Sequence, residues 1–318
     1  MVVTGHDFPM AAQAGLAMLG GEDVHVDTPT GPVRGHHWPA KRTTGPPVVI
    51  CPGFTEFCEK YAAVAARLTG LGHDVLIIDW PGQGRSGHLG KLSLSVHIDD
   101  FEDHLVAADA LMAAVGFARG PVVFLGHSMG GHLALRLVAR HQARVLGAII
   151  LAPMIAPPVM PVWAVRLLAL AIVTAGFGRR PALGRQPRPL AVERVFQDGN
   201  GLTRVRKGYE DQFVWFDDAP ELRRSGPTAG WVRAAYESCV ATTLNKAWMR
   251  RLEVPVLALI PEDDWIVHQP STNRMLPCLR KCQRVSFAGA RHELLYETEE
   301  VQAELWRRIE GFLASLQP

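Results

Sequence analysis

Short apolar runs alternate with helical patterns through the first half of the chain. The runs are PVVIC (47–51), DVLIID (74–79), PVVFL (121–125) and VLGAIIL (145–151). The segments between them have helical spacing, and the one at 99–115 carries an apolar stripe of Phe101, Leu105, Ala108, Met112 and Val115. Because strands separated by helices are joined by crossovers, this pattern predicts a parallel sheet with helices packed on it.

The same alternation frames the two ends of the chain. Near the C-terminus, VPVLALI (254–260) and RVSF (284–287) predict two further strands. The last helix is predicted from a stripe of Val301, Leu305, Ile309 and Phe312. Before residue 47, the stretches near 24–27 and 33–37 predict two antiparallel strands.

Residues 153–251 break the alternation. They hold clustered prolines, an apolar stretch at 161–178, an arginine-rich passage at 179–207 and a predicted helix at 229–242. We expect this part to be a helical cap that is inserted into an α/β core and covers the carboxyl edge of the sheet. The core then consists of residues 1–152 and 252–318.

Composition favours a large buried core and excludes some function classes. With 318 residues, 48% hydrophobic and 20% charged, the chain is long and apolar enough to fold compactly. A net charge of +2 and the absence of a zinc knuckle or basic zipper argue against nucleic acid as a partner. Five cysteines without paired CxxC spacing indicate neither a disulfide framework nor a structural zinc site, which fits a reducing compartment.

The apolar segments bear on location. No Lys or Arg precedes the mildly apolar residues 10–19, which disfavours a signal peptide. The stretch 161–178 is interrupted by Arg166 and is shorter than the roughly 20 residues of a membrane span. We still expect the apolar side chains of this stretch to be buried against the protein, a ligand or a lipid surface. We expect a cytoplasmic protein, and peripheral contact of the cap with the inner membrane surface stays open.

The pentapeptide GHSMG (126–130) lies between a predicted strand and a predicted helix, the context that a GxSxG nucleophile elbow requires. A serine in such a turn has strained backbone, and the flanking glycines remove Cβ atoms that would clash. We predict that Ser128 is a nucleophile. The simpler interpretation is a turn of small residues between strand and helix.

A serine hydroxyl needs a base, and the base needs an orienting acid. Loops after the last two predicted strands contain PEDDWIV (261–267) and AGARHELL (288–295), at the edge where a parallel sheet gathers reactive groups. They offer Asp263 or Asp264 as the acid and His292 as the base. The order serine, aspartate, histidine along the chain is that of the α/β-hydrolases.

From residue 47 onward the chain resembles serine α/β-hydrolases of the branch containing lysophospholipases and monoacylglycerol lipases. The matching pieces are PGFTEFCEKY (52–61), DWPGQGRSG (79–87), GHSMGG (126–131), DWIV (264–267) and HELLYE (292–297). The family's acid precedes x-[IV]-V, so the resemblance selects Asp264, and it matches His292 to the base. PGFTEFCEKY and GPTAGW (226–231) look closest to bacterial lysophospholipases.

The resemblance also implies an oxyanion hole made by the backbone N–H groups of Phe54 and Met129. Each such donor contributes about 3 kcal/mol to catalysis. Pro52 stands where many relatives have histidine, which matters little because the donors are backbone groups.

For the wall of a lipid pocket we select the helix around Trp163 and the indole of Trp231.

Other features have simpler explanations. His127 is interpreted as a packing residue on the opposite face of the turn from Ser128, not as a second base. GQGRSG (82–87) matches the dinucleotide pattern GxGxxG, but no helix pattern follows it, which favours a tight structural loop. His36 and His37 point to opposite faces of a strand, and no HExxH motif occurs, so we expect no metal and no cofactor.

The resemblance implies a serine hydrolase that cleaves the carboxylic ester of a single-chain lipid, foremost a lysophospholipid, through an acyl-enzyme on Ser128. Passage 179–207 is then either a solvated face or a site for the lipid headgroup. Three alternatives stay open: a monoacylglycerol lipase or general carboxylesterase, an aminopeptidase-like hydrolase with Glu210 or Asp211 holding a free amino group, and a non-catalytic binding protein.

Overall fold

One eight-stranded sheet organises the chain, with strand order β1-β2-β4-β3-β5-β6-β7-β8. Our computed structural model describes residues 20–316, so the stretch 10–19 considered above as a signal peptide lies outside the described residues. The strands are β1 (Glu22–Thr28), β2 (Gly31–Trp38), β3 (Val48–Cys51), β4 (Val75–Ile78), β5 (Val122–His127), β6 (Val145–Leu151), β7 (Val256–Pro261) and β8 (Cys282–Phe287). The pairs β1–β2 and β2–β4 are antiparallel and the other five are parallel, as the sequence predicts.

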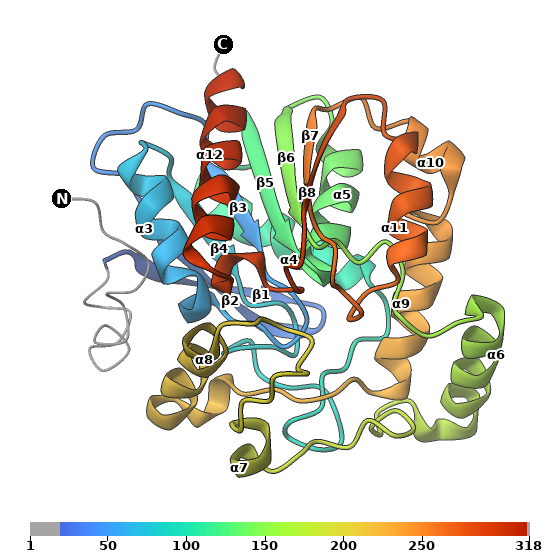
Figure 1. Cartoon of the computed structure of the whole chain (residues 1–318). Helices are drawn as coiled ribbons and strands as arrows, with labels where there is room; N and C mark the ends of the chain where they lie inside the picture. Colours follow the sequence, from blue (N-terminus) through green and yellow to red (C-terminus); the bar gives the residue numbers. More distant parts are fainter. Residues whose placement is uncertain (1–19, 317–318) are drawn as a thin grey trace.

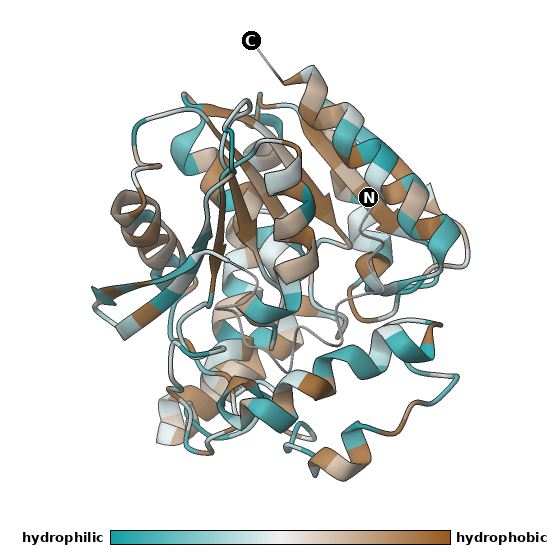
Figure 2. Ribbon diagram, turned by 90° about the vertical axis from the view of Figure 1, so that its left-hand side faces the viewer, coloured by the Kyte–Doolittle hydropathy of each residue, from teal (hydrophilic) through white to brown (hydrophobic). Residues whose placement is uncertain are grey.

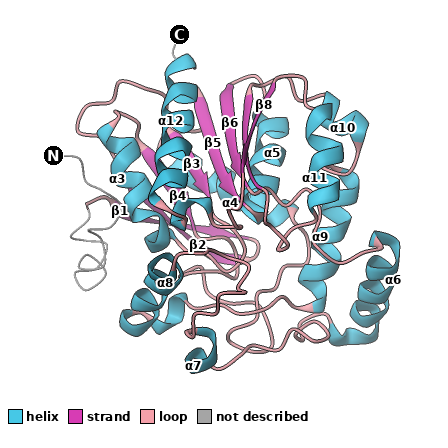
Figure 3. Ribbon diagram, in the orientation of Figure 1, coloured by secondary structure: helices cyan, strands magenta, loops and turns pink. Residues whose placement is uncertain are grey.

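Helices cover both faces of this sheet (Figure 3). The helices of the core are η1 (Cys58–Tyr61), α3 (Ala62–Gly70), α4 (Glu102–Ala114), α5 (Met129–His141), α11 (Gln269–Met275), η4 (Leu276–Cys278), η5 (Leu294–Tyr296) and α12 (Glu299–Ser315). Those between β6 and β7 are α6 (Val162–Ile172), the π-helical turn η2 (Val173–Phe177), α7 (Leu190–Glu193), α8 (Arg206–Asp218), η3 (Pro220–Leu222), α9 (Ala229–Ala241) and α10 (Lys246–Arg250). The α/β-hydrolase architecture expected from the sequence is therefore present.

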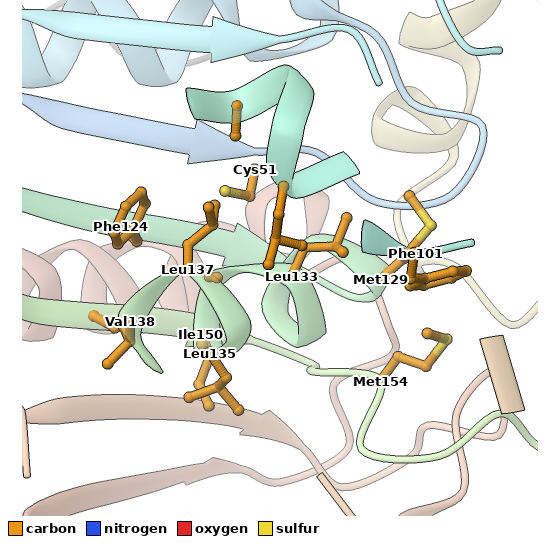
Figure 4. Close-up of a cluster of buried hydrophobic side chains, with 14 of the residues drawn as sticks. Cys51, Phe101, Phe124, Met129, Leu133, Leu135, Leu137, Val138, Ile150 and Met154 are labelled. Atoms are coloured by element: carbon orange, nitrogen blue, oxygen red, sulfur yellow. The ribbon is translucent and has the colours of Figure 1, made fainter. Parts of the chain in front are cut away.

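Burial on both faces explains the uninterrupted apolar runs. Successive residues of β5 point to opposite sides of the sheet, so Phe124 packs in the cluster with α4 and α5 while Leu125 packs in the cluster with α3 and α12. The central strands accordingly form a hydrophobic layer between helices of mixed character (Figure 2). Figure 4 shows part of the first cluster, where Leu133 and Leu137 of α5 lie beside Cys51 of β3 and Phe124 lies farther back along the sheet.

Residues 152–255, here called the β6–β7 segment, connect two neighbouring strands and hold the helices from α6 to α10. Its helix α9 occupies the predicted helix at 229–242, and α8 packs through Phe213 and Phe216 on Phe57 of the core. In Figure 1, α6, α7 and α8 lie beyond one end of the sheet, with α6 at the outer edge beside α9, whereas α10 lies alongside α11. The division into a core and a cap at 153–251 stays a prediction.

Helix α6 is apolar, yet nearly all of its residues are exposed or half-buried. Trp163 and Leu167 are 66% and 60% exposed, and Ala169 is the buried residue of this helix. We expected the stretch 161–178 to be buried against the protein, a ligand or a lipid surface. Burial against the protein is wrong for most of α6, so a ligand or a lipid surface remains as the partner of its apolar side chains. Within residues 20–316, no helix has the length and apolarity to cross a membrane.

Candidate active site

Ser128 lies in the sharp turn between β5 and α5. Its φ of 55° and ψ of −119° are strained for a residue with a side chain. Its backbone is fixed on both sides, because Ser128 N donates to Leu151 O at 2.9 Å and Met154 N donates to Ser128 O at 2.9 Å. A Cβ atom at Gly130 would overlap the carbonyl of Cys51. Glycine at this position is therefore required by the approach of α5 to β3, which agrees with the elbow motif.

His292 and Asp264 meet at the ends of β8 and β7. His292 Nδ1 is 2.7 Å from Asp264 Oδ2, and both residues are buried. The other carboxylate oxygen of Asp264 accepts from the backbone N–H of Ile266 at 2.8 Å. This bond orients the acid and explains why an aspartate precedes x-I-V here. The side chain of Asp263 is exposed, so of the two aspartates the structure brings Asp264 to the histidine.

The loop after β3 carries Phe54 beside the turn that holds Ser128. Gln83 holds this loop at two points, because its Nε2 donates to Gly53 O at 3.1 Å and its Oε1 accepts from Thr55 N at 2.9 Å. Thr55 has a φ of 66°, a strained conformation that the two bonds help maintain. Neither Phe54 N–H nor Met129 N–H is bonded to another described residue, so both remain available to an incoming oxygen. The sequence predicted GQGRSG as a structural loop but did not reveal the contact of Gln83.

Behind this loop lies a buried group of charged side chains that sequence analysis missed. Lys60 Nζ bridges Glu56 Oε1 at 2.9 Å and Glu293 Oε1 at 2.8 Å. Burial alone raises the pKa of Glu56, but the charges of Lys60 and His127 lower it well below its usual range. Burial alone lowers the pKa of Lys60, but Glu293 and Glu56 raise it above its usual range. Hydropathy places such residues at the surface, and their only signal was the resemblance of 52–61 and 292–297 to a family.

His127 belongs to this group. It is buried, as expected of a packing residue, but both of its ring nitrogens have polar contacts: Nδ1 faces Glu56 Oε1 at 3.1 Å and Nε2 faces His292 O at 3.2 Å. Its ring centroid lies 4.8 Å from that of His292, which places the residue before Ser128 next to the histidine. The interpretation of His127 as a mere packing residue is therefore incomplete.

An apolar pocket of about 340 Å³ reaches Ser128. Its wall combines the loop after β3 and the turn at Ser128 with α6, α9 and neighbouring loops. The lining residues include Phe54, Met129, Met154, Val165, Leu168, Ala169, Ile172, Leu183, Arg185, Trp231, Val232, Tyr236, Ile266 and Val267. Trp231 lies in this wall, as expected. Trp163 does not, because Val165, Leu168, Ala169 and Ile172 form the pocket side of α6 and Trp163 projects from another side.

The fold and the elbow define a serine α/β-hydrolase, and comparison with known proteins agrees. Residues 45–299 match the family described as Serine aminopeptidase, S33. The chain is 31% identical over 283 residues to lysophospholipase L2 of Escherichia coli (strain K12), covering 83% of this chain and 79% of that protein. It is 23% identical to the probable lysophospholipase L2 of Haemophilus influenzae, over 84% and 83% of the two chains.

A solved structure supports the same fold. The soluble variant of monoglyceride lipase from Saccharomyces cerevisiae, in complex with a substrate analog, superimposes with a TM-score of 0.71 at 16% identity, over 94% of this chain and 97% of that one. The chain therefore belongs to the Serine aminopeptidase, S33 family of α/β-hydrolases, in the lysophospholipase and monoacylglycerol lipase branch. It is a carboxylic ester hydrolase.

Proposed function

We propose that the protein hydrolyses the carboxylic ester of a lysophospholipid through an acyl-enzyme on Ser128. The observation that carries this proposal is the apolar pocket that reaches Ser128 and has a single charged lining residue, Arg185. A wall of this kind suits one acyl chain, whose transfer out of water stabilises the complex by about 0.8 kcal/mol per methylene. The similarity to two lysophospholipases L2 supports the same substrate class.

The catalytic roles follow from the geometry. Ser128 Oγ attacks the ester carbonyl while His292 takes its proton, and Asp264 holds the tautomer of His292 and stabilises the imidazolium. The N–H groups of Phe54 and Met129 donate to the oxyanion. His292 returns the proton to the departing glycerol oxygen, which leaves the fatty acyl group on Ser128. A water molecule then gives a proton to His292 and attacks the acyl carbonyl. The bond to Ser128 Oγ breaks, His292 returns the proton to that oxygen, and the fatty acid is released.

The aminopeptidase alternative needs an anionic group for a free amine. Its candidates, Glu210 and Asp211, lie on α8, which contributes no lining residue to the pocket, and Glu210 pairs with Arg206 at 3.4 Å. The charge at the pocket is instead that of Arg185. This arrangement favours an ester with an anionic headgroup over an aminoacyl amide.

A panel of substrates tests the proposed function. We expect kcat/KM to rise by up to about fourfold per added methylene, equivalent to ~0.8 kcal/mol, until the pocket is filled. The panel comprises lysophospholipids and monoacylglycerols of increasing chain length, p-nitrophenyl acetate and aminoacyl amides. If acetyl esters or aminoacyl amides have a higher kcat/KM than every long-chain lipid, the substrate is not a lysophospholipid.

Arg185 is our candidate for recognition of the phosphate. Within passage 179–207, several cations are already paired: Arg194 with Asp217, Arg204 with Glu297 and Arg206 with Glu210. Arg185 has no ion pair or side-chain hydrogen bond with a described residue, and it lines the pocket. The passage was interpreted either as a solvated face or as a site for the lipid headgroup. Arg185 is the residue of this passage that we propose for the headgroup site.

Replacing Arg185 with glutamine should lower kcat/KM for lysophospholipid by about three- to tenfold and leave monoacylglycerol hydrolysis unchanged. The wild-type preference for lysophospholipid should also weaken as salt is added. Arg188→Gln is the matched control, because Arg188 belongs to the same passage but does not line the pocket. An equal loss on both substrates would assign Arg185 a structural role instead.

We also propose that the exposed side of α6 contacts an anionic lipid surface. Residues 153–192 contain five arginines and no acidic residue, and Trp163, Leu167 and Phe177 are exposed among them. Apolar side chains combined with basic ones are typical of surface-bound helices. Such contact would place the pocket mouth near its substrate.

The double variant Trp163→Ser, Leu167→Ser should bind anionic vesicles at least tenfold more weakly, while its turnover of a short water-soluble ester stays unchanged, because neither residue lines the pocket. Leu71→Ser is the control for a general loss of apolar surface, because Leu71 is exposed at the end of α3, outside the β6–β7 segment. Vesicle co-sedimentation measures the binding. Equal binding by the double variant and the wild type would exclude α6 as the contact.

A further inference from the structure

His127 faces two acceptors at once. Its Nδ1 lies 3.1 and 3.2 Å from the two carboxylate oxygens of Glu56, and its Nε2 lies 3.2 Å from the backbone carbonyl of His292. A neutral imidazole has one N–H and one lone pair, so in that form one of the two contacts would set a lone pair against an oxygen. Only the imidazolium donates at both positions.

Glu56 is an acceptor in this arrangement because it is surrounded by donors. Lys60 Nζ donates to its Oε1 at 2.9 Å, Tyr61 OH donates to its Oε2 at 2.6 Å, and Gly53 N also donates to Oε2. A carboxylate that receives so many donors is held in its ionised form. The proton between Glu56 and His127 therefore belongs to the histidine.

Charge balance leads to the same assignment. Among the described residues, Lys60, from η1, and Glu293, from the loop after β8, are the other charged groups packed against Glu56 and His127. The titratable ring of His292 also faces His127, with 4.8 Å between the ring centroids. Two carboxylates and one ammonium would leave a buried negative charge, which is costly, whereas an imidazolium at His127 makes the group neutral. Burial alone lowers the pKa of His127, but Glu56 and Glu293 raise it above its ordinary 6.5.

We infer that His127 is an imidazolium in the working enzyme and acts as a positioning residue. It links the loop after β3 that carries Phe54, here called the oxyanion loop, to the loop after β8 that carries His292, here called the His292 loop. One donor reaches the carbonyl of His292. The other reaches Glu56, which binds Gly53 N directly before Phe54. This inference rests on the proposed roles of His292 and Phe54 but not on the identity of the lipid.

The arrangement gives the enzyme a defined alkaline limit. The folded state favours the protonated ring of His127, so this protonation stabilises the fold. The stabilisation is complete below pH 6.5 and is lost as the pH rises through the raised pKa of His127. Above that pKa, one of the two bonds of His127 is lost. The oxyanion loop or the His292 loop is then released, and kcat falls.

The first experiment observes the proton directly. In the wild-type protein labelled with ¹⁵N-histidine, we expect a buried ring with both nitrogens protonated at pH 7 whose signal is absent from His127→Gln; a second such signal, from His36 beside Asp23, should persist in the variant if that ring is also protonated. His104 and His132 provide internal references, because burial lowers the pKa of each to about 3 and they remain neutral. A neutral His127 ring at pH 7 would overturn the inference. This spectrum needs no substrate, so it is independent of the lysophospholipid proposal.

The second experiment measures the pH profile of His127→Gln. We expect kcat to fall about tenfold, KM to stay within twofold because His127 does not line the pocket, and the alkaline limb of the wild-type profile to disappear. A p-nitrophenyl ester serves as substrate if lysophospholipid is not turned over. A variant with the wild-type alkaline limb would contradict a positioning role, even if its activity is reduced. If the variant does not fold, Glu56→Gln replaces it, and in that variant the second ring proton of His127 should be lost.

Discussion

Replacing Ser128 with alanine should lower kcat by on the order of 10⁴- to 10⁶-fold while the thermal midpoint stays close to that of the wild type. The change removes one oxygen from a small side chain, and the backbone bonds that fix the elbow do not involve that oxygen. His292→Ala should cause a loss of similar size. Turnover of the p-nitrophenyl ester or lipid substrate measures both, and retention of a tenth of wild-type activity by Ser128→Ala would exclude it as the nucleophile.

The double variant Ser128→Ala, His292→Ala is the more discriminating test of the pair. If the two residues act as one unit, removing the second causes almost no further loss, because the base has no proton to take once the nucleophile is absent. Additive losses would show that His292 and Ser128 act independently.

Asp264→Asn should lower kcat by about 10⁴-fold, whereas Asp263→Asn should stay within about twofold of the wild type. The amide oxygen of the new side chain would keep the bond from Ile266 N, so its NH₂ group would face His292 Nδ1. That contact favours the proton on Nε2, the tautomer that is unable to accept a proton from Ser128. Asp263 is the matched control because it is adjacent and exposed. The reverse ranking of kcat would transfer the role of the acid to Asp263.

The central part of the sheet was predictable because strands β3 to β7 are buried on both faces. In β5 and β6, uninterrupted apolar runs end at turn residues, and α4 and α12 carry their stripes at the expected spacing. The elbow was predictable for a similar reason, since GHSMG has a strand before it and a helix after it. Choosing between Asp263 and Asp264 required a family resemblance, because adjacent residues differ mainly in the direction of their side chains.

The buried charged group and the pocket side of α6 were not predictable, because they depend on contacts between distant parts of the chain. Glu56, Lys60 and Glu293 look like surface residues in the sequence, and only the folded chain brings them into one buried group beside His127. The side of α6 that lines the pocket was also hidden, because this helix is apolar on nearly all sides and its periodicity does not distinguish Trp163 from Leu168.

Labelling by a fluorophosphonate probe tests the central claim most directly, since the probe reacts with an activated serine and the lipid competes for the same pocket. Peptide mass spectrometry identifies the labelled residue, and the rate is measured with and without a long-chain lysophospholipid. We expect one adduct, on Ser128, with a labelling rate that the lysophospholipid slows far more than an acetyl ester at equal concentration does. An adduct on another residue, no adduct, or labelling that the lipid does not slow would contradict a lipid ester hydrolase with Ser128 as its nucleophile.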